Sequence, residues 1–230
     1  MEKSKEDFEK YKIPETTKAI LLMMMDKIHK ILTEHKIKYF VDGGSLLGAV
    51  RHNGMIPWDD DIDIGVFDKD FEKIIPLFEK NLYDDEIHIL LQRTTKDMIK
   101  VFVANLWFKN KETGKIIGTP TLDIFRYTKG NNIVKLASIA ERIRFPNCYY
   151  KCDELFPLKE YKFDNITVMG ARLPLPYLHR YYGNDCLTKY KIDVRKEDGI
   201  NKHRNHIESL STDILSTDSL STDTGKIEIS

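Results

Sequence analysis

Residues 41–66 read VDGGSLLGAVRHNGMIPWDDDIDIGV, and this stretch decides the fold of the chain. Acidic and apolar residues alternate near its end, as Asp61-Ile62-Asp63-Ile64. Because successive side chains of a strand point to opposite faces, Asp61 and Asp63 are expected on one face, roughly 6–7 Å apart, with the two isoleucines in the core. Two neighbouring carboxylates repel each other unless a cation lies between them. Oxygen ligands suit magnesium or manganese, so the pair is a candidate metal site.

A glycine turn stands one short helix before these acids. Gly43, Gly44 and Ser45 lie between an expected strand at 37–41 and an expected helix that Ser45 is predicted to cap. Glycine lets the backbone approach a ligand closely, and a helix N-terminus offers free N–H groups that favour phosphate. A GGS triplet alone most often marks only a turn. Its place beside the acidic pair makes these three residues candidates for phosphate binding.

A third acid follows later, in Leu122-Asp123-Ile124, where acidic and apolar residues alternate in the same way. We expect Asp123 to face the same cleft as Asp61 and Asp63 and to complete the set of oxygen ligands. An isolated acid at a strand end is as often a partner in an ion pair. One or two ions held by the three acids would stabilise the attacking and leaving oxygens of a phosphoryl displacement.

Composition sets the outer bounds. The 230 residues contain 36 Lys+Arg and 36 Asp+Glu, so overall charge gives no reason to expect a nucleic-acid partner. Cys148, Cys152 and Cys186 fit neither a disulfide framework nor a zinc pattern. The charged N-terminus does not resemble a signal peptide, and the longest apolar run, residues 19–25, is too short for a membrane span. These features predict a soluble cytoplasmic protein.

Hydrophobic periodicity predicts a mixed α+β domain. Expected helices cover residues 15–36, 46–52, 68–82 with a break at Pro76, 133–145 and 176–182. Expected strands cover 37–41, 61–66, 87–91, 99–108 and 121–127, with a hairpin connection at 110–118 and a late hairpin at 163–169.

The last part of the sequence differs in composition from the rest. Leu-Ser-Thr-Asp recurs at Leu210, Leu215 and Leu220, a spacing that fits neither helix nor strand. Such a segment has too few apolar residues to bury, so we predict a folded domain at 1–195 and a disordered tail at 196–230.

The order GGS, DxD and a later acid resembles the DNA polymerase beta-like nucleotidyltransferase fold, in which helices flank a mixed sheet. Within that superfamily, residues 42–64 resemble the core motif of the LicD family of phosphorylcholine transferases and fukutin-related proteins. LDIF at 122–125 is similar to the family's second acidic motif. FPLKEYKF at 156–163 and YLHRYYGND at 177–185 are similar to its C-terminal motifs, and the resemblance spans residues 20–185.

This resemblance implies a metal-dependent transfer of a phospho-alcohol group, such as phosphocholine, from a CDP-activated donor. The acceptor would be a sugar hydroxyl on a glycan, and CMP would be released. Asp61, Asp63 and Asp123 match the family's acids that bind Mg²⁺ or Mn²⁺, and Gly44 and Ser45 match its phosphate-side turn. Asp123 is also a candidate to accept the proton of the acceptor hydroxyl.

Four further residues are candidates for substrate contacts. Arg51 matches the arginine after the family's LLGAV helix, and a guanidinium suits two diphosphate oxygens, although a structural pairing is the alternative. His52 is either a substrate contact or a hydrogen-bonded structural residue. Trp58 either stacks on a base or shapes the turn, and Lys159 is a candidate for a donor phosphate.

Two other classes of protein stay open. A nucleotidyltransferase or a nucleotide-sugar-using transferase also fits a DxD metal site, but little chain precedes this DxD for the usual nucleotide-binding half of a glycosyltransferase. The other class is a calcium-binding module of the EF-hand type. Its loop positions one, three, five and twelve would be held by Asp59, Asp61, Asp63 and Asp70. Ile64 stands where that loop needs glycine.

Overall fold

A computed structural model gives the fold of residues 12–82, 89–103, 108–109 and 116–189. The start of the strand predicted at 87–91, the end of that at 99–108, most of the connection at 110–118, the domain boundary at 195 and the tail lie outside these residues.

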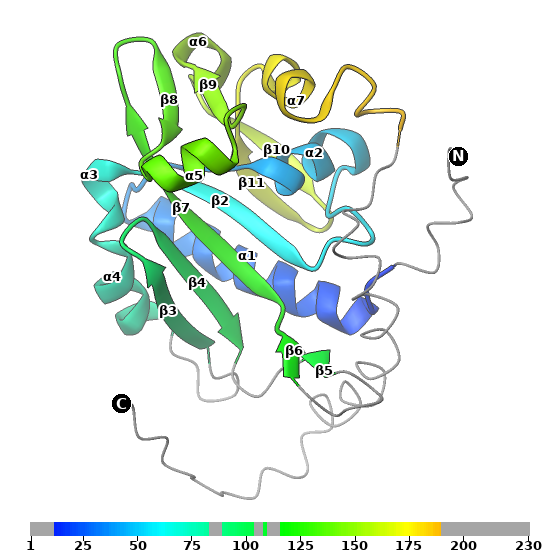
Figure 1. The fold of residues 1–230 in the computed structure, drawn as a ribbon. Helices are drawn as coiled ribbons and strands as arrows, with labels where there is room; N and C mark the ends of the chain where they lie inside the picture. Colours follow the sequence, from blue (N-terminus) through cyan, green and yellow to red (C-terminus); the bar gives the residue numbers. More distant parts are fainter. Residues whose placement is uncertain (1–11, 83–88, 104–107, 110–115, 190–230) are drawn as a thin grey trace, which may run out of the picture.

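Helices and strands alternate irregularly along the chain (Figure 1). The helices are α1 (Glu15–Glu34), α2 (Gly43–His52), α3 (Asp68–Phe71), α4 (Ile74–Asn81), α5 (Ile139–Arg144), α6 (Cys152–Leu155) and α7 (Pro174–Tyr182). The strands are β1 (Tyr39–Val41), β2 (Asp61–Phe67), β3 (Ile89–Thr95), β4 (Met98–Val103), β5 (Phe108–Lys109), β6 (Ile116–Gly118), β7 (Thr121–Lys129), β8 (Ile133–Leu136), β9 (Tyr149–Lys151), β10 (Lys159–Phe163) and β11 (Ile166–Gly170).

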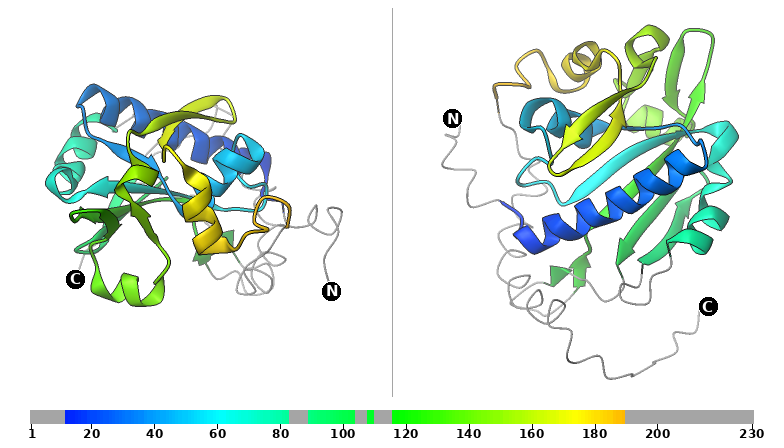
Figure 2. Two further views of the ribbon diagram at one scale, coloured as in Figure 1. Left: turned by 90° about the horizontal axis from the view of Figure 1, so that it is seen from above. Right: turned by 180° about the vertical axis from the view of Figure 1, so that it is seen from behind.

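A seven-stranded mixed sheet forms the centre of the described chain. Its strands follow the order β1-β2-β7-β4-β3, while β8 pairs with β7 and β9 with β8. Strands β2 and β7 run parallel, and the other neighbours run antiparallel. Helix α1 crosses one face of the sheet, as the view from behind shows (Figure 2). Helix α5 lies on the opposite side, as the view from above shows (Figure 2), so the two faces of the sheet have different coverage.

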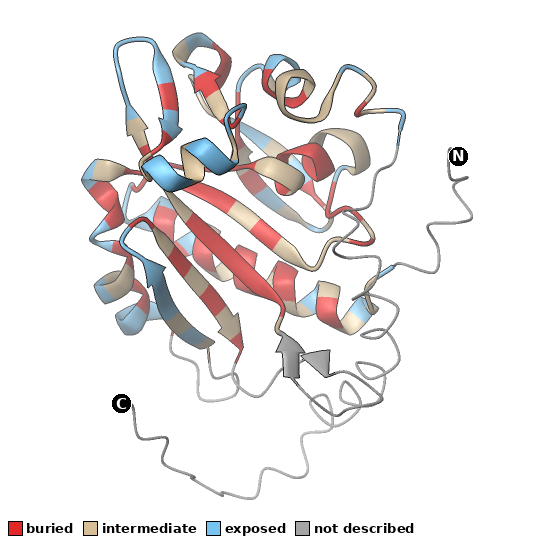
Figure 3. Ribbon diagram, in the orientation of Figure 1, coloured by how far each residue is buried: buried red, intermediate tan, exposed pale blue. Residues whose placement is uncertain are grey.

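The core explains why these segments form these elements. Helix α1 buries one apolar stripe of Leu21, Leu22, Met24, Met25, Ile28, Ile31 and Leu32. Strand β2 alternates between partly exposed acids and fully buried isoleucines, and β7 is buried over most of its length (Figure 3). No helix in the described ranges is both long and apolar enough to cross a bilayer. Cys148, Cys152 and Cys186 are free thiols, as the sequence predicts.

Most local predictions are confirmed, and three are wrong. The helix predicted at 68–82 is divided, but the break lies at residues 72–73 and not at Pro76. Pro76 lies in the first turn of α4, where proline costs no hydrogen bond. The helix predicted at 133–145 is instead strand β8 followed by α5. Residues 133–136 alternate between exposed and buried positions and pair with β7 and β9. The helix begins only after Ser138, whose side chain accepts a hydrogen bond from the backbone N–H of Glu141.

The third wrong prediction concerns Ser45. It is the third residue of α2, and the residue before the helix is Asp42. The Ser45 hydroxyl oxygen accepts a hydrogen bond of 2.9 Å from the backbone N–H of Asp63. The Ser45 hydroxyl therefore bonds to β2 and does not cap its own helix.

Asp42 forms a buried polar cluster behind α2. Its carboxylate is 4% exposed and accepts hydrogen bonds from the hydroxyls of Tyr127 and, at 2.7 Å, Tyr150. Burial raises the pKa of both phenols well above their usual range, and the charge on Asp42 raises it further. Both tyrosines therefore stay protonated donors at neutral pH and compensate the buried charge.

Tyr127→Phe is expected to lower the free energy of unfolding by about 1–3 kcal/mol, because it leaves the Asp42 carboxylate with one donor fewer. Chemical denaturation of the variant measures this loss. Tyr149→Phe is the matched control, since no hydrogen bond of the Tyr149 hydroxyl is found among the described residues. Equal stability of the two variants would contradict a compensating role for Tyr127.

Candidate active site

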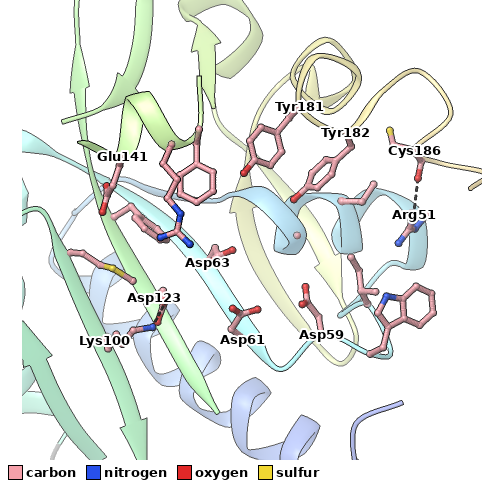
Figure 4. A pocket seen from close by; sticks show the side chains of 18 of the residues that line it. Arg51, Asp59, Asp61, Asp63, Lys100, Asp123, Glu141, Tyr181, Tyr182 and Cys186 are labelled. Carbon is pink, nitrogen blue, oxygen red and sulfur yellow. Dashed lines mark hydrogen bonds and ion pairs between the residues drawn. The ribbon is translucent and has the colours of Figure 1, made fainter. Parts of the chain in front are cut away.

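Two parallel strands bring the three predicted acids to one cleft. In the register of β2 and β7, Asp63 stands opposite Asp123, and Asp61 stands opposite Thr121. Asp61, Asp63 and Asp123 all line a cleft of about 810 Å³ (Figure 4), into which their carboxylates point. The alternation predicted for both strands is therefore confirmed, since the intervening Ile62 and Leu122 are fully buried.

Asp63 lies at the centre of this negative charge. Its pKa is raised well above the usual range, first by burial and then by the charges of Asp61, Asp123, Asp59 and Asp42. Each of these causes disfavours the ionised form of the carboxyl group. A divalent cation in the cleft would reverse this balance, because it favours the ionised form of every acid near it.

Asp123 adds an independent sign of a cation site. The residue is only 6% exposed, and its Oδ2 accepts a hydrogen bond of 2.5 Å from Lys100 Nζ. Its Oδ1 atom is buried and has no hydrogen-bond partner. Buried carboxylate oxygens normally have partners, so an orphaned one beside Asp63 fits a missing ligand. Together with the carboxylates of β2, this donor set suits a hard ion such as Mg²⁺ or Mn²⁺.

A second group of acids lies just before β2. Carboxylate oxygens of Asp59, Asp60 and Asp61 lie within 4.8 Å of one another in the described chain. Asp59 lines the cleft together with Asp61. Asp61 belongs to both groups, but among the described residues only Asp59, Asp60 and Asp61 bring three carboxylate oxygens within 4.8 Å of one another. Asp61, Asp63 and Asp123 share the cleft without meeting that distance.

The structure contradicts the EF-hand interpretation. Strand β2 is extended from Asp61 to Phe67, so Asp61 and Asp63 do not belong to a loop that turns around an ion. Asp70 lies in α3, where its carboxylate pairs with Lys73 at 2.7 Å. The acids needed for such a calcium site therefore do not gather.

The glycine turn packs directly against the acids. Gly43 has a φ of +50°, and a Cβ there would lie 3.2 Å from Asp63 Oδ2 and 3.6 Å from the Tyr182 hydroxyl. A Cβ on Gly44 would lie 2.6 Å from Asp59 Oδ2. Only glycine lets the start of the ten-residue helix α2 come this close to the carboxylates. The N-terminus of α2 and the acids of β2 thus lie side by side at the cleft.

Arg51 and Trp58 also line the cleft. The Arg51 Nη1 atom donates hydrogen bonds to the backbone carbonyls of Cys186, at 2.8 Å, and Lys189, at 3.3 Å. Arg51 therefore ties the segment after α7 to the end of α2 (Figure 4). Trp58 is only 8% exposed, and its ring meets that of His52 edge-on, with centroids 6.1 Å apart.

Two predicted contacts lie outside the cleft. His52 lines a separate hollow between α1, α2 and the β10–β11 turn. Lys159 is exposed on β10, with its Nζ 4.7 Å from the centre of the Tyr161 ring. The structure thus brings Gly44, Arg51 and Trp58 to the acids, but not His52 or Lys159.

Further lining residues were not assigned from the sequence: Lys100, Glu141, Arg144, Tyr181 and Tyr182. Lys100 had a usable signal, because it alternates with Ile99 and Val101 and so faces the opposite side from these core residues. Glu141 and Arg144 could not be assigned in this way, because the helix that carries them was predicted to begin at the wrong residue.

A family model described as LicD/FKTN/FKRP, nucleotidyltransferase domain, matches residues 36–171. The chain belongs to this family. The match includes all three acids, the glycine turn and Lys100, and it ends before α7. Membership in the LicD/FKTN/FKRP family, together with the mixed sheet, confirms the predicted α+β nucleotidyltransferase fold.

This LicD-family chain is also similar to several individual proteins. RP689 of Rickettsia prowazekii is 34% identical over 182 residues, which cover 78% of this chain and 60% of that protein. The lipopolysaccharide cholinephosphotransferase LicD of Haemophilus influenzae is 31% identical over 87 residues, or 36% of this chain and 33% of the relative. Human ribitol 5-phosphate transferase FKRP is 48% identical over 40 residues, or 17% and 8%. In each case the match covers less than two thirds of the relative's length.

Proposed function

We propose that this chain catalyses the metal-dependent transfer of a phospho-alcohol group from a CDP-activated donor to a sugar hydroxyl on a glycan. The observation that carries the proposal is the register of β2 and β7, which places Asp63 opposite Asp123 with Asp61 on the same cleft wall. The names of two relatives support the class of reaction, since one transfers choline phosphate and the other ribitol 5-phosphate.

The bonds exchanged follow from the donor's diphosphate. The acceptor hydroxyl oxygen forms a bond to the phosphorus that carries the alcohol, and the bond from that phosphorus to the bridging oxygen breaks. CMP leaves with the bridging oxygen, and the hydroxyl proton passes to a base. A carboxylate of the cleft is the candidate base.

Residues of the chain would bind the cation and the phosphate groups of the donor. Asp61, Asp63 and Asp123 would hold Mg²⁺ or Mn²⁺, which supplies positive charge for the diphosphate oxygens. The N-terminus of α2 at Gly43 and Gly44 offers backbone N–H groups to a phosphate oxygen.

A thermal-shift panel tests the proposal. The protein is mixed with CDP-choline, CDP-ribitol, CTP or UDP-glucose, each with and without Mg²⁺. We expect a CDP-alcohol to raise the melting temperature only when Mg²⁺ is present. A ligand at 100 times its Kd stabilises the native state by about 2.7 kcal/mol. For a chain of this size such a gain corresponds to a shift of roughly 5–10 °C.

Product analysis then separates the alternatives. With a bound CDP-alcohol and an oligosaccharide acceptor, the proposal predicts release of CMP. Pyrophosphate released from CTP would instead show a nucleotidyltransferase, and UDP released from UDP-glucose would show a glycosyltransferase. Either of these products without CMP would overturn the proposal.

A further inference from the structure

The cleft contains a lysine that is bonded to a predicted metal ligand. Lys100 on β4 stands opposite Asp123 on β7 in the antiparallel register of these strands. Its Nζ atom lies 2.5 Å from Asp123 Oδ2, and the two side chains are 31% and 8% exposed (Figure 4). Lys100 therefore reaches the buried acid from the open side of the cleft.

The ion pair involves only one of the two carboxylate oxygens of Asp123. Asp123 Oδ2 is bonded to Lys100, whereas Oδ1 is buried without a partner. A structural ion pair of a buried acid is expected to satisfy both oxygens. A carboxylate with one oxygen neutralised by a lysine and the other free to bind a cation would show this pattern.

From this geometry we propose that Lys100 is a mobile counter-ion, an inference that rests on the proposed function. Its ammonium neutralises Asp123 when no divalent cation is bound, and it moves to the donor's diphosphate when cation and donor are both present. Lysine suits this exchange, because its charge is compact and lies at the end of a flexible stem. Among the described residues, three other cations line the cleft. Arg51 bonds backbone carbonyls, Lys189 pairs with Asp185 at 3.4 Å, and the guanidinium carbon of Arg144 lies 5.0 Å from the centre of the Phe145 ring.

Electrostatics gives the direction of each step. A divalent cation beside Asp123 repels the ammonium, so Lys100 and the cation compete for the same carboxylate. The arriving diphosphate brings negative charge into the same cleft and attracts the released ammonium. Lys100 thus weakens the binding of the cation alone and strengthens the binding of the donor.

The test measures two affinities in Lys100→Met and Lys100→Gln. Titration calorimetry with Mn²⁺ alone is expected to show about tenfold tighter binding than in the wild type. Titration with CDP-choline or CDP-ribitol at saturating Mn²⁺ is expected to show about tenfold weaker binding. Lys100→Gln keeps a hydrogen-bond donor near Asp123 and carries the test if the methionine variant fails to fold. Lys135→Met, at an exposed position of β8, is the matched control and should change neither affinity.

A mobile counter-ion predicts that the two affinities change in opposite directions, whereas a residue that only supports Asp123 does not. Weaker binding of both ligands would mean that Lys100 only positions Asp123, and unchanged binding would mean that it has no part in the site. Either result overturns the inference while leaving the proposed function intact. A wild-type protein that binds neither Mn²⁺ nor any CDP-alcohol would instead overturn the proposed function, and the inference with it.

Discussion

Asp63→Asn is expected to lower phospho-alcohol transfer by about 10³-fold, a loss of roughly 4 kcal/mol of transition-state stabilisation. Asp63 lies between Asp61 on its own strand and Asp123 across the β2–β7 pair, so it is the central residue of the three proposed ligands. An amide has no charge to hold a divalent cation. Initial rates of CMP release at saturating Mg²⁺ measure the effect, and Asp61→Asn is expected to behave in the same way.

The same variant is expected to keep its fold. Burial and the neighbouring carboxylates raise the pKa of Asp63 in the folded protein, so the folded state binds its proton more tightly than the unfolded chain. The metal-free wild type must therefore lose stability as the pH rises through and above the usual Asp range. Asp63→Asn removes this loss, so at pH 8 without metal it should melt at the wild-type temperature or higher.

Asp26→Asn is the matched control for these measurements, because its carboxylate pairs with Lys30 on α1, away from the cleft. It should leave the rate of transfer unchanged. If Asp63→Asn kept more than a tenth of wild-type activity, the metal site would have no part in the mechanism. If the variant unfolded, the ionised Asp63 carboxylate would not be a source of repulsion in the folded protein.

Gly43→Ala is the other substitution with a large expected effect. Gly43 has a φ of +50°, a conformation that costs a residue with a side chain about 1–2 kcal/mol. The added methyl group would also lie 3.2 Å from Asp63 Oδ2 and displace this carboxylate. Small displacements of reacting groups are costly, so we expect transfer to fall by about 10- to 100-fold.

Kinetics and denaturation of Gly43→Ala are compared with those of Gly130→Ala. Gly130 stands in the turn between β7 and β8, where a Cβ would meet its nearest neighbour, the carbonyl of Ile133, at 3.6 Å. This control should cost little stability and no activity. Equal behaviour of the two variants would show that the close approach of α2 to the acids is not needed.

Local patterns predicted the part of the site that local geometry determines. The two-residue period of a strand is enough to place Asp61 and Asp63 on one face, and the same period places Asp123. The pairing of Asp123 with Lys100 depends on the register of β4 against β7, which is a contact between distant segments. No pattern within either strand predicts this pairing, although the alternation around Lys100 shows which face of β4 its side chain occupies.

Contacts between distant segments also decide where His52, Ser45 and Lys159 lie. Adjacent helical residues point about 100° apart, so Arg51 can face the cleft while His52 faces another hollow. Ser45 was predicted to cap its own helix, but β2 supplies a backbone N–H donor to its hydroxyl. Lys159 belongs to the β10–β11 hairpin, which forms a sheet separate from the one that carries the acids.

Anomalous diffraction from a crystal soaked in Mn²⁺ tests the central claim most directly. We predict a peak within bonding distance of carboxylate oxygens of Asp61, Asp63 and Asp123. A peak bound instead by Asp59, Asp60 and Asp61, whose oxygens lie within 4.8 Å of one another, would contradict this assignment, as would the absence of any peak at saturating Mn²⁺.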